Sequence, residues 1–190
     1  DRLSVAYGFT AYDILRLRHK VIDSVPDVVL YPDTTEQVEK IVAYSTEHDI
    51  PLYVYGGGSS VTRGVEPVKG GISLDMRRRF NKVISFNEID QTITVQAGMS
   101  GPDLEKTLQN APELFGAKRQ YTCGHFPQSF EYSSVGGWTV TRGAGQNSTY
   151  YGCIADIVLS QKYATPIGTI QTSHYSREAC GPDLNQIMMG

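Results

Sequence analysis

The sequence predicts an α+β fold, in which a small parallel βαβ sheet is followed by a larger antiparallel sheet with helices. Apolar runs at 28–31 and 52–55 flank a segment with helical spacing, which is the pattern of a parallel βαβ unit. Alternating apolar and polar residues further along the chain predict a hairpin of antiparallel strands. The twelve tyrosines and nineteen glycines indicate a turn-rich fold with pockets rather than a helical bundle.

The length, charge and hydrophobicity of the sequence exclude several classes of protein. With 190 residues, the chain forms one domain or two small subdomains that share a core. The net charge of −3 argues against a nucleic-acid partner. No apolar run approaches the roughly 18 residues of a membrane span, and no signal peptide is recognised. The composition is therefore that of an ordinary soluble globular protein.

The cysteines indicate neither a disulfide framework nor a zinc site. Cys123, Cys153 and Cys180 are odd in number and far apart, and none belongs to a Cys-x-x-Cys pair. Cys123-Gly-His125 supplies two residue types that bind metals, but two ligands are too few for a site. We therefore predict no metal ligand and expect a reducing compartment.

The first part of the chain predicts a helical segment and then a parallel sheet. Thr34 is a good N-cap, and Gln37 three residues later completes a capping-box pattern. His48 follows the helix as a surface or capping residue rather than as a ligand, because a helix C-terminus favours a cation. The expected elements are a helix at 12–18 within an N-terminal segment at 1–24, strands at 28–31, 52–55 and 71–75, and a helix from Thr34 to His48.

The second part predicts antiparallel strands and further helices. Ser100 caps a helix with Pro102 in its first turn, and Leu104 and Leu108 supply its apolar face. Residues 110–132 show little regular pattern, which is typical of a functional loop. The expected elements are strands at 83–86 and 92–97, a helix after Ser100, a short helix or turn at 133–144, strands at 154–162 and 168–171, and a helix that starts at 181 with Leu184, Ile187 and Met188 as its apolar positions.

The turn after the strand at 52–55 is the strongest candidate for a ligand site. Its three glycines permit positive φ, and without a Cβ they let backbone N–H groups approach a ligand closely. Successive N–H groups in such a turn form a concave anion site, for which a nucleotide diphosphate is the obvious guest. An ordinary turn is the alternative interpretation of this stretch. The second glycine-rich element, at 133–138, favours the ligand site.

These segments resemble a known family. Gly56–Val61, Gly124–Pro127, Phe130–Trp138 and Asn185–Gly190 are similar to the FAD-binding domain of the vanillyl-alcohol-oxidase type of flavoproteins, and Phe130–Trp138 most resembles its alkylglycerone-phosphate synthase branch. The resemblance implies an FAD-binding domain at 25–190, with a first α/β subdomain at 25–78 and a second, truncated subdomain at 79–190. It places FAD between the two subdomains.

The resemblance also implies which residues contact FAD. The residues fall into a pyrophosphate loop, a second segment before the glycine pair, and a third segment after it. They are Val54, Tyr55, Gly56, Gly57, Gly58, Ser59 and Ser60; Gln128, Ser129, Phe130, Glu131, Tyr132, Ser133 and Ser134; and Thr141, Arg142, Gly143 and Ala144. A further FAD loop and a substrate-binding cap, which carries the catalytic groups, would follow Gly190, so we predict no catalytic residue in this chain.

The function that the resemblance implies is exchange of the acyl chain of acyl-dihydroxyacetone phosphate for a fatty alcohol, with the flavin acting as an electrophile and no net redox change. Two alternatives stay open: an FAD-dependent oxidoreductase that acts on a 2-hydroxy acid or an alcohol, and a flavin-free binding module. The substrate is a small lipid or hydroxy acid, and a homodimer would form through the region absent from this chain. We expect an intracellular protein, peroxisomal in a eukaryote or cytoplasmic in a bacterium.

The cofactor is expected to be bound non-covalently. Covalent attachment near the first loop uses a histidine among the glycines in this superfamily, and residues 56–60 contain none. A cysteine link lies close before the second glycine pair in some members. Cys123 lies thirteen residues ahead of Gly136, which does not match that spacing.

Overall fold

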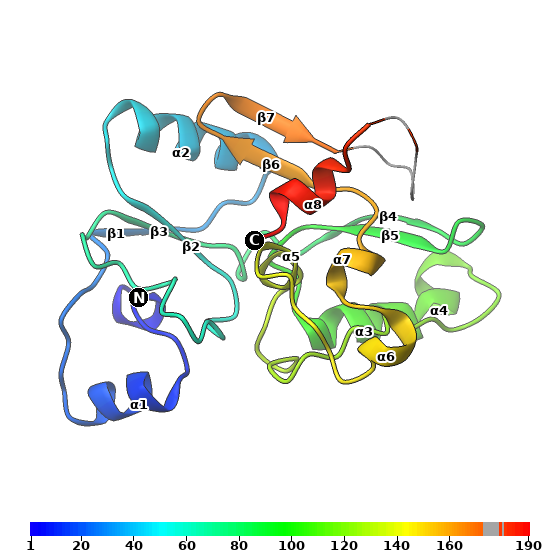
Figure 1. Ribbon diagram of the computed structural model, residues 1–190, viewed down its shortest axis with the longest axis horizontal. Coiled ribbons are helices and arrows are strands. Elements are labelled where there is room, and N and C mark those ends of the chain that lie inside the picture. The colour runs from blue at the N-terminus through cyan, green and yellow to red at the C-terminus, as the bar shows by residue number, and fades with distance from the viewer. Residues whose placement is uncertain (173–178, 180) are drawn as a thin grey trace.

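The computed structural model describes residues 1–172, 179 and 181–190, so Cys180 lies outside the described residues. Helices combine with parallel and antiparallel strands, which confirms the predicted α+β class (Figure 1). The parallel sheet lies beside the N-terminal segment, and the β4–β5 hairpin lies on the other side of the molecule with helices α3 to α7 (Figure 1). Among the described residues, every helix is too short or too polar to cross a lipid bilayer.

The parallel sheet has the order β1-β3-β2, with β1 at Val28–Leu30, β2 at Leu52–Tyr55 and β3 at Ile72–Asp75. All four residues of β3 are buried because it is the central strand. Both of its pairings are parallel, so the carboxyl ends of the three strands lie at one edge. The predicted βαβ unit is thus confirmed.

Helix α2 (Thr35–Glu47) connects β1 to β2 and begins where the sequence predicts. The Thr34 side chain accepts a hydrogen bond from the Gln37 N–H at 3.3 Å, as an N-cap does. Gln37 Oε1 accepts from the N–H of Asp33, not of Thr34, so the full capping box does not form. At the other end, the His48 ring stacks on Tyr44 and its Nδ1 lies 3.0 Å from the Tyr44 carbonyl, which confirms the capping role.

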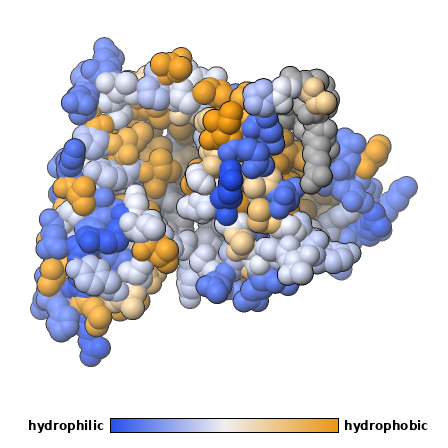
Figure 2. Space-filling model, viewed as in Figure 1, coloured by the Kyte–Doolittle hydropathy of each residue, from blue (hydrophilic) through white to orange (hydrophobic). Residues whose placement is uncertain are grey.

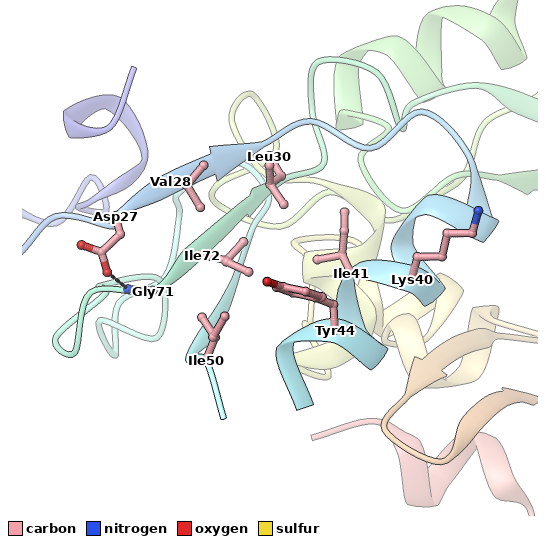
Figure 3. Close-up of a pocket in the computed structure, with 9 residues that line it drawn as sticks. All are labelled: Asp27, Val28, Leu30, Lys40, Ile41, Tyr44, Ile50, Gly71 and Ile72. Carbon is pink, nitrogen blue, oxygen red and sulfur yellow. Dashed lines mark hydrogen bonds between the residues drawn. The ribbon is translucent and has the colours of Figure 1, made fainter. Parts of the chain in front are cut away.

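A groove of about 610 Å³ lies between α2 and the sheet, lined by apolar side chains that include Val28, Ile41 and Ile72 (Figure 3). Apolar residues reach the surface over this part of the molecule (Figure 2). Asp27 and Gly71, which also line the groove, are joined by a 2.6 Å hydrogen bond just before β1 and β3 begin. The groove therefore reaches the amino ends of the strands. Ligands of parallel sheets bind at the opposite edge.

The predicted strands at 83–86 and 92–97 and the predicted helix after Ser100 are confirmed. Strands β4 (Val83–Asn87) and β5 (Thr92–Val95) pair antiparallel. Helix α3 (Gly101–Gln109) is capped by Ser100, whose Oγ accepts from the Asp103 N–H at 3.1 Å. Its predicted apolar residues, Leu104 and Leu108, are buried in a core with Met99, Trp138 and Ile154.

The larger antiparallel sheet is where the prediction differs from the structure. Strand β6 begins only at Lys162, because residues 154–157 form helix α7 (Ile154–Ile157), whose first turn is capped by a 2.9 Å bond from the Cys153 N–H to Asp156. In the described residues, β6 (Lys162–Thr165) and β7 (Gly168–Gln171) form their own two-stranded sheet. This sheet packs on α2 and does not extend the first hairpin.

The remaining helices are short. Helix α4 (Ala111–Phe115) lies in the stretch expected to be irregular, and Gly116 in the left-handed region ends it. In α8 (Leu184–Met188), the predicted apolar positions Leu184 and Ile187 are exposed, and the polar Asn185 is buried. The other elements are the 3₁₀ turn η1 (Leu3–Val5) and helices α1 (Ala11–Arg18), α5 (Val135–Val140) and α6 (Ser148–Tyr151).

Candidate cofactor-binding site

The glycine turn follows β2 directly, at the carboxyl edge of the parallel sheet. In the described part of the chain, the backbone N–H groups of residues 57–60 donate no hydrogen bond to protein. Buried or half-buried N–H groups normally have a partner, and residues 57–60 are all buried or half-buried. The turn therefore offers a row of free donors, which suits a negatively charged ligand.

The structure brings the glycine turn against the second predicted segment. A Cβ on Gly57 would overlap the carbonyl group of Tyr132 and come within 2.7 Å of the Ser133 Cα. A Cβ on Gly56 would overlap Ser134 Oγ. The sequence-based reason for these glycines was room for a diphosphate. The structure shows that the missing Cβ at Gly56 and Gly57 makes room for the protein's own second segment.

Inside the second segment, two of the predicted site residues support the backbone. Ser133 Oγ accepts the indole N–H of Trp138 at 2.7 Å and donates to the Ser129 carbonyl at 2.8 Å. Ser134 caps α5. Phe130 packs in the core against Trp138 and Gly101. These contacts give the segment a rigid backbone that meets the glycine turn.

The other members of the second segment face outward. Gln128, Glu131 and Tyr132 are exposed, and Tyr132 keeps 68% of its surface. Its ring lies 6.1 Å from the ring of Phe9, which is 56% exposed. These exposed side chains are the ones in the segment that are free to contact a ligand.

The third segment is joined to the second through Trp138. The Gly143 N–H donates to the Trp138 carbonyl at 2.9 Å, and Ala144 is exposed. Arg142 has φ 49° and donates to the Gln186 carbonyl at 2.7 Å, so its guanidinium is directed to α8. Thr141 Oγ1 donates to the Gly137 carbonyl. Among the described residues, no hydrogen bond joins residues 141–144 to the glycine turn.

The two residues before the glycines differ in what they can reach. Val54 is exposed, whereas Tyr55 is 1% exposed and its hydroxyl donates to the Tyr7 carbonyl at 3.2 Å. Burial raises the pKa of Tyr55. The Tyr55 side chain therefore belongs to the core beneath the turn, and its carbonyl accepts the Met76 N–H at 3.0 Å.

Cys123 and His125 are two neighbouring residues of metal-binding type. Among the described residues, no group of three metal-binding side chains comes together. Burial raises the pKa of the Cys123 thiol and lowers the pKa of His125, so both groups are neutral near pH 7. His125 is 1% exposed, its ring lies edge-on to Trp138, and neither ring nitrogen has a partner in the described structure.

The structure adds an element to the site that the sequence did not reveal. The Phe9 N–H donates to the Gly58 carbonyl at 3.0 Å. A cavity of about 580 Å³ lies beside this contact, lined by Tyr7, Phe9, Tyr55 and Arg77 among others. Residues 1–24 contain no glycine-rich turn, and the basic run at 16–20 does not point to a contact with the turn at 56–60.

Similarity to known proteins extends over the whole chain. The FAD binding domain family matches residues 26–174. The alkyldihydroxyacetonephosphate synthase of Dictyostelium discoideum is 33% identical over 192 residues, which is 100% of this chain and 30% of that protein. A solved structure of an alkyldihydroxyacetonephosphate synthase matches 100% of this chain and 33% of its own, with a TM-score of 0.89 and 32% identity.

A second kind of relative matches slightly less of the chain. The mitochondrial D-lactate dehydrogenase [cytochrome] 1 of Saccharomyces cerevisiae is 29% identical over 176 residues, which is 90% of this chain and 28% of that protein. The chain thus spans about a third of the length of the relatives it matches.

Proposed function

The chain belongs to the FAD-binding domain family, and on that premise we propose that it is the cofactor-binding part of an enzyme that makes ether lipids. In this proposal, the complete enzyme exchanges the acyl chain of acyl-dihydroxyacetone phosphate for a fatty alcohol. The observation that carries the proposal is the match to the alkyldihydroxyacetonephosphate synthases along the full chain, at a TM-score of 0.89.

The residues of the glycine turn fit the cofactor. The free N–H groups of residues 57–60 suit the diphosphate of FAD, since such donors are strong partners for an anion. The turn and the second segment form one rigid junction, because Gly57 packs on Tyr132 and Ser133. We assign the diphosphate to Gly56–Ser60 and the adjoining part of FAD to the exposed residues of Gln128–Ser134. When bound, FAD supplies the electrophilic ring at which the exchange takes place.

We propose that the flavin is held non-covalently. The glycine turn has no histidine. The Cys123 thiol is a poor nucleophile, because burial raises its pKa and the thiolate is the reactive form. The turn thus lacks the histidine, and the Cys123 thiol lacks the reactive form, that a covalent link would need.

An oxidoreductase acting on a 2-hydroxy acid is the second candidate, favoured by the 29% identity to the yeast D-lactate dehydrogenase. That match leaves out a tenth of the chain, whereas the synthase match leaves out none. In both candidates, the substrate is a small molecule. We place the catalytic groups and any homodimer contact of the complete enzyme in the further part that these relatives have, and we propose an intracellular location.

The experiment that tests the proposal uses the complete enzyme. An absorbance spectrum first shows whether the purified protein carries flavin. The protein is then incubated with acyl-dihydroxyacetone phosphate and a long-chain alcohol, without an electron acceptor. Ether-linked product with the flavin still oxidised is the expected result. Bleaching of the flavin by a 2-hydroxy acid, with no ether product, would establish the oxidoreductase instead. A colourless protein that does not bind added FAD would refute both.

A further inference from the structure

The N-terminal segment (residues 1–24) lies outside the match to the FAD-binding family, which begins at residue 26. It nevertheless packs on the same core as β2. Val5 and Tyr55 belong to one buried cluster, and the Tyr55 hydroxyl donates to the Tyr7 carbonyl. The segment is therefore held in a defined place beside the carboxyl edge of the sheet.

The segment contacts the glycine turn directly at Gly8 and Phe9. The Phe9 N–H donates to the Gly58 carbonyl at 3.0 Å. A Cβ on Gly8 would lie 3.1 Å from the carbonyl oxygens of both Gly58 and Ser60. The carbonyl groups of the turn thus face the N-terminal segment.

A second connection holds the end of the same loop. Arg16 on α1 is 5% exposed and binds both carboxylate oxygens of the buried Glu66, at 2.9 and 3.2 Å. Arg63 and Ser24 also donate to Glu66. Burial alone would raise the pKa of Glu66, but the hydrogen bonds from Arg16, Arg63 and Ser24 outweigh it and lower the pKa, so the carboxylate is charged. The stretch from Gly58 to Glu66 is therefore tied to the N-terminal segment at both ends.

Because the peptide bond is planar, the hydrogen bond from Phe9 to the Gly58 carbonyl also orients the N–H group of Ser59. In a trans peptide, the C=O and N–H groups point in opposite directions, and the described residues contain no cis peptide bond. The Gly58 carbonyl and the Ser59 N–H belong to one peptide unit. Because the carbonyl is held by Phe9, the Ser59 N–H points away from the N-terminal segment, and it has no protein acceptor in the described structure.

We propose that the N-terminal segment is a positioning element of the cofactor site, which holds the Gly58 carbonyl through the Phe9 N–H so that the Ser59 N–H faces the diphosphate. This inference rests on the proposed assignment of Gly56–Ser60 to the diphosphate of FAD. Phe9 acts through the turn and need not contact FAD itself. Without the bond from Phe9, the peptide unit between Gly58 and Ser59 is free to rotate, and the donor is no longer preorganised.

The test compares two substitutions of Phe9 in the complete enzyme. Phe9→Pro removes the N–H, whereas Phe9→Ala removes the ring and keeps the N–H. We expect Phe9→Pro to raise the dissociation constant for FAD about ten-fold, as the loss of one hydrogen bond to a charged group does. Phe9→Ala keeps the N–H but removes the packing of the ring beside Gly58 and Tyr132, so it is expected to weaken binding clearly less than Phe9→Pro does. Equal losses in both variants would show that the ring and not the N–H supports the site, and would overturn the inference.

A second pair of variants keeps the test valid if Phe9→Pro does not fold. Gly8→Ala places a Cβ 3.1 Å from the Gly58 and Ser60 carbonyl oxygens and from Asp13 Oδ2. We expect the turn to shift by a few tenths of an ångström, as contacts this close require. Gly64→Ala is the matched control in the same loop, because its Cβ would lie no closer than 3.6 Å to another atom. Gly8→Ala should weaken FAD binding, and Gly64→Ala should not.

The ³¹P NMR spectrum of bound FAD separates positioning from a general loss of stability. The diphosphate resonances should shift in Phe9→Pro and Gly8→Ala, while the visible spectrum of the flavin stays that of the parent. Lower thermal stability with unchanged ³¹P resonances and unchanged affinity would show a merely structural role and overturn the inference. A parent protein that binds no FAD would instead refute the proposed function, so the two failures are distinguishable.

Discussion

Gly57→Ala is the substitution that most directly tests the junction between the two glycine-rich segments. The added Cβ would overlap the Tyr132 carbonyl and lie 2.7 Å from the Ser133 Cα, and backbone atoms cannot turn aside as a flexible side chain can. The two segments would have to separate by roughly 1.5 Å, and such overpacking costs about 1–3 kcal/mol. The φ angle of Gly57 is not in the left-handed region, so the effect comes from the contact alone.

The same separation moves the N–H groups of the turn away from the diphosphate. A hydrogen bond to a charged group contributes about 1.5–3 kcal/mol, so the loss of two such bonds amounts to about 3 kcal/mol or more. At 1.4 kcal/mol for each factor of ten, FAD should bind about 100-fold more weakly. The melting temperature should fall as well, by about 2–4 °C for each kcal/mol of destabilisation.

The assay is a fluorescence titration with FAD and a thermal melt, with Gly64→Ala as the control. Gly64 lies in the same loop but has space for a Cβ, so its variant should match the parent in both measurements. If Gly57→Ala binds FAD as tightly as the parent and melts at the same temperature, the turn does not pack on Tyr132, and the reasoning fails.

Three further predictions concern the pH dependence of stability, the C-terminal helix and the flavin linkage. Because burial lowers the pKa of His125, the unfolded chain takes up a proton below about pH 6.5 that the folded chain does not. The free energy of unfolding should therefore fall as the pH is lowered from 6.5. Urea titrations should show this pH dependence in the parent, and His125→Gln should remove it. Asn185→Ala should cost about 1–3 kcal/mol in the same urea assay, because it removes the bonds of the buried Asn185 side chain to the Leu159 carbonyl and from the Thr172 hydroxyl. An unchanged midpoint would contradict the role of Asn185. Acid should release all the flavin from the complete protein, and flavin fluorescence on the denatured band in a gel would contradict non-covalent binding.

Local signals in the sequence determined most of the elements and the position of the glycine turn. Thr34 and Ser100 cap their helices as predicted, since an N-cap depends on residues only three positions apart. The apolar runs at 28–31 and 52–55 predicted parallel strands, because a βαβ unit needs only a strand, a helix and a strand in order. The turn follows β2, so its place at the carboxyl edge of the sheet was also determined locally.

The prediction failed at residues 154–157 because two local signals compete there. The apolar run predicts a strand, whereas the cap between Cys153 and Asp156, three residues apart, accompanies the helix that forms. In the C-terminal helix, tertiary contacts decide instead. The apolar positions of α8 predicted a buried face on Leu184 and Ile187. Asn185 is buried instead, because its side chain forms hydrogen bonds with the Leu159 carbonyl and the Gln161 side chain, which lie just before β6. Pattern alone cannot show which polar groups a fold will leave to be satisfied.

In the candidate site, too, the sequence determines some features and the tertiary contacts determine others. The sequence by itself determined that residues 56–60 and 133–138 are rich in glycine and serine, and that they resemble an FAD-binding pattern. Only the tertiary structure decided that Gly57 lies against Tyr132 and that Phe9 holds the Gly58 carbonyl, since these contacts join residues far apart in the chain. A hydrogen bond between backbone groups leaves no trace in residue type, and for this reason the N-terminal segment's part in the site could be seen only in the folded chain.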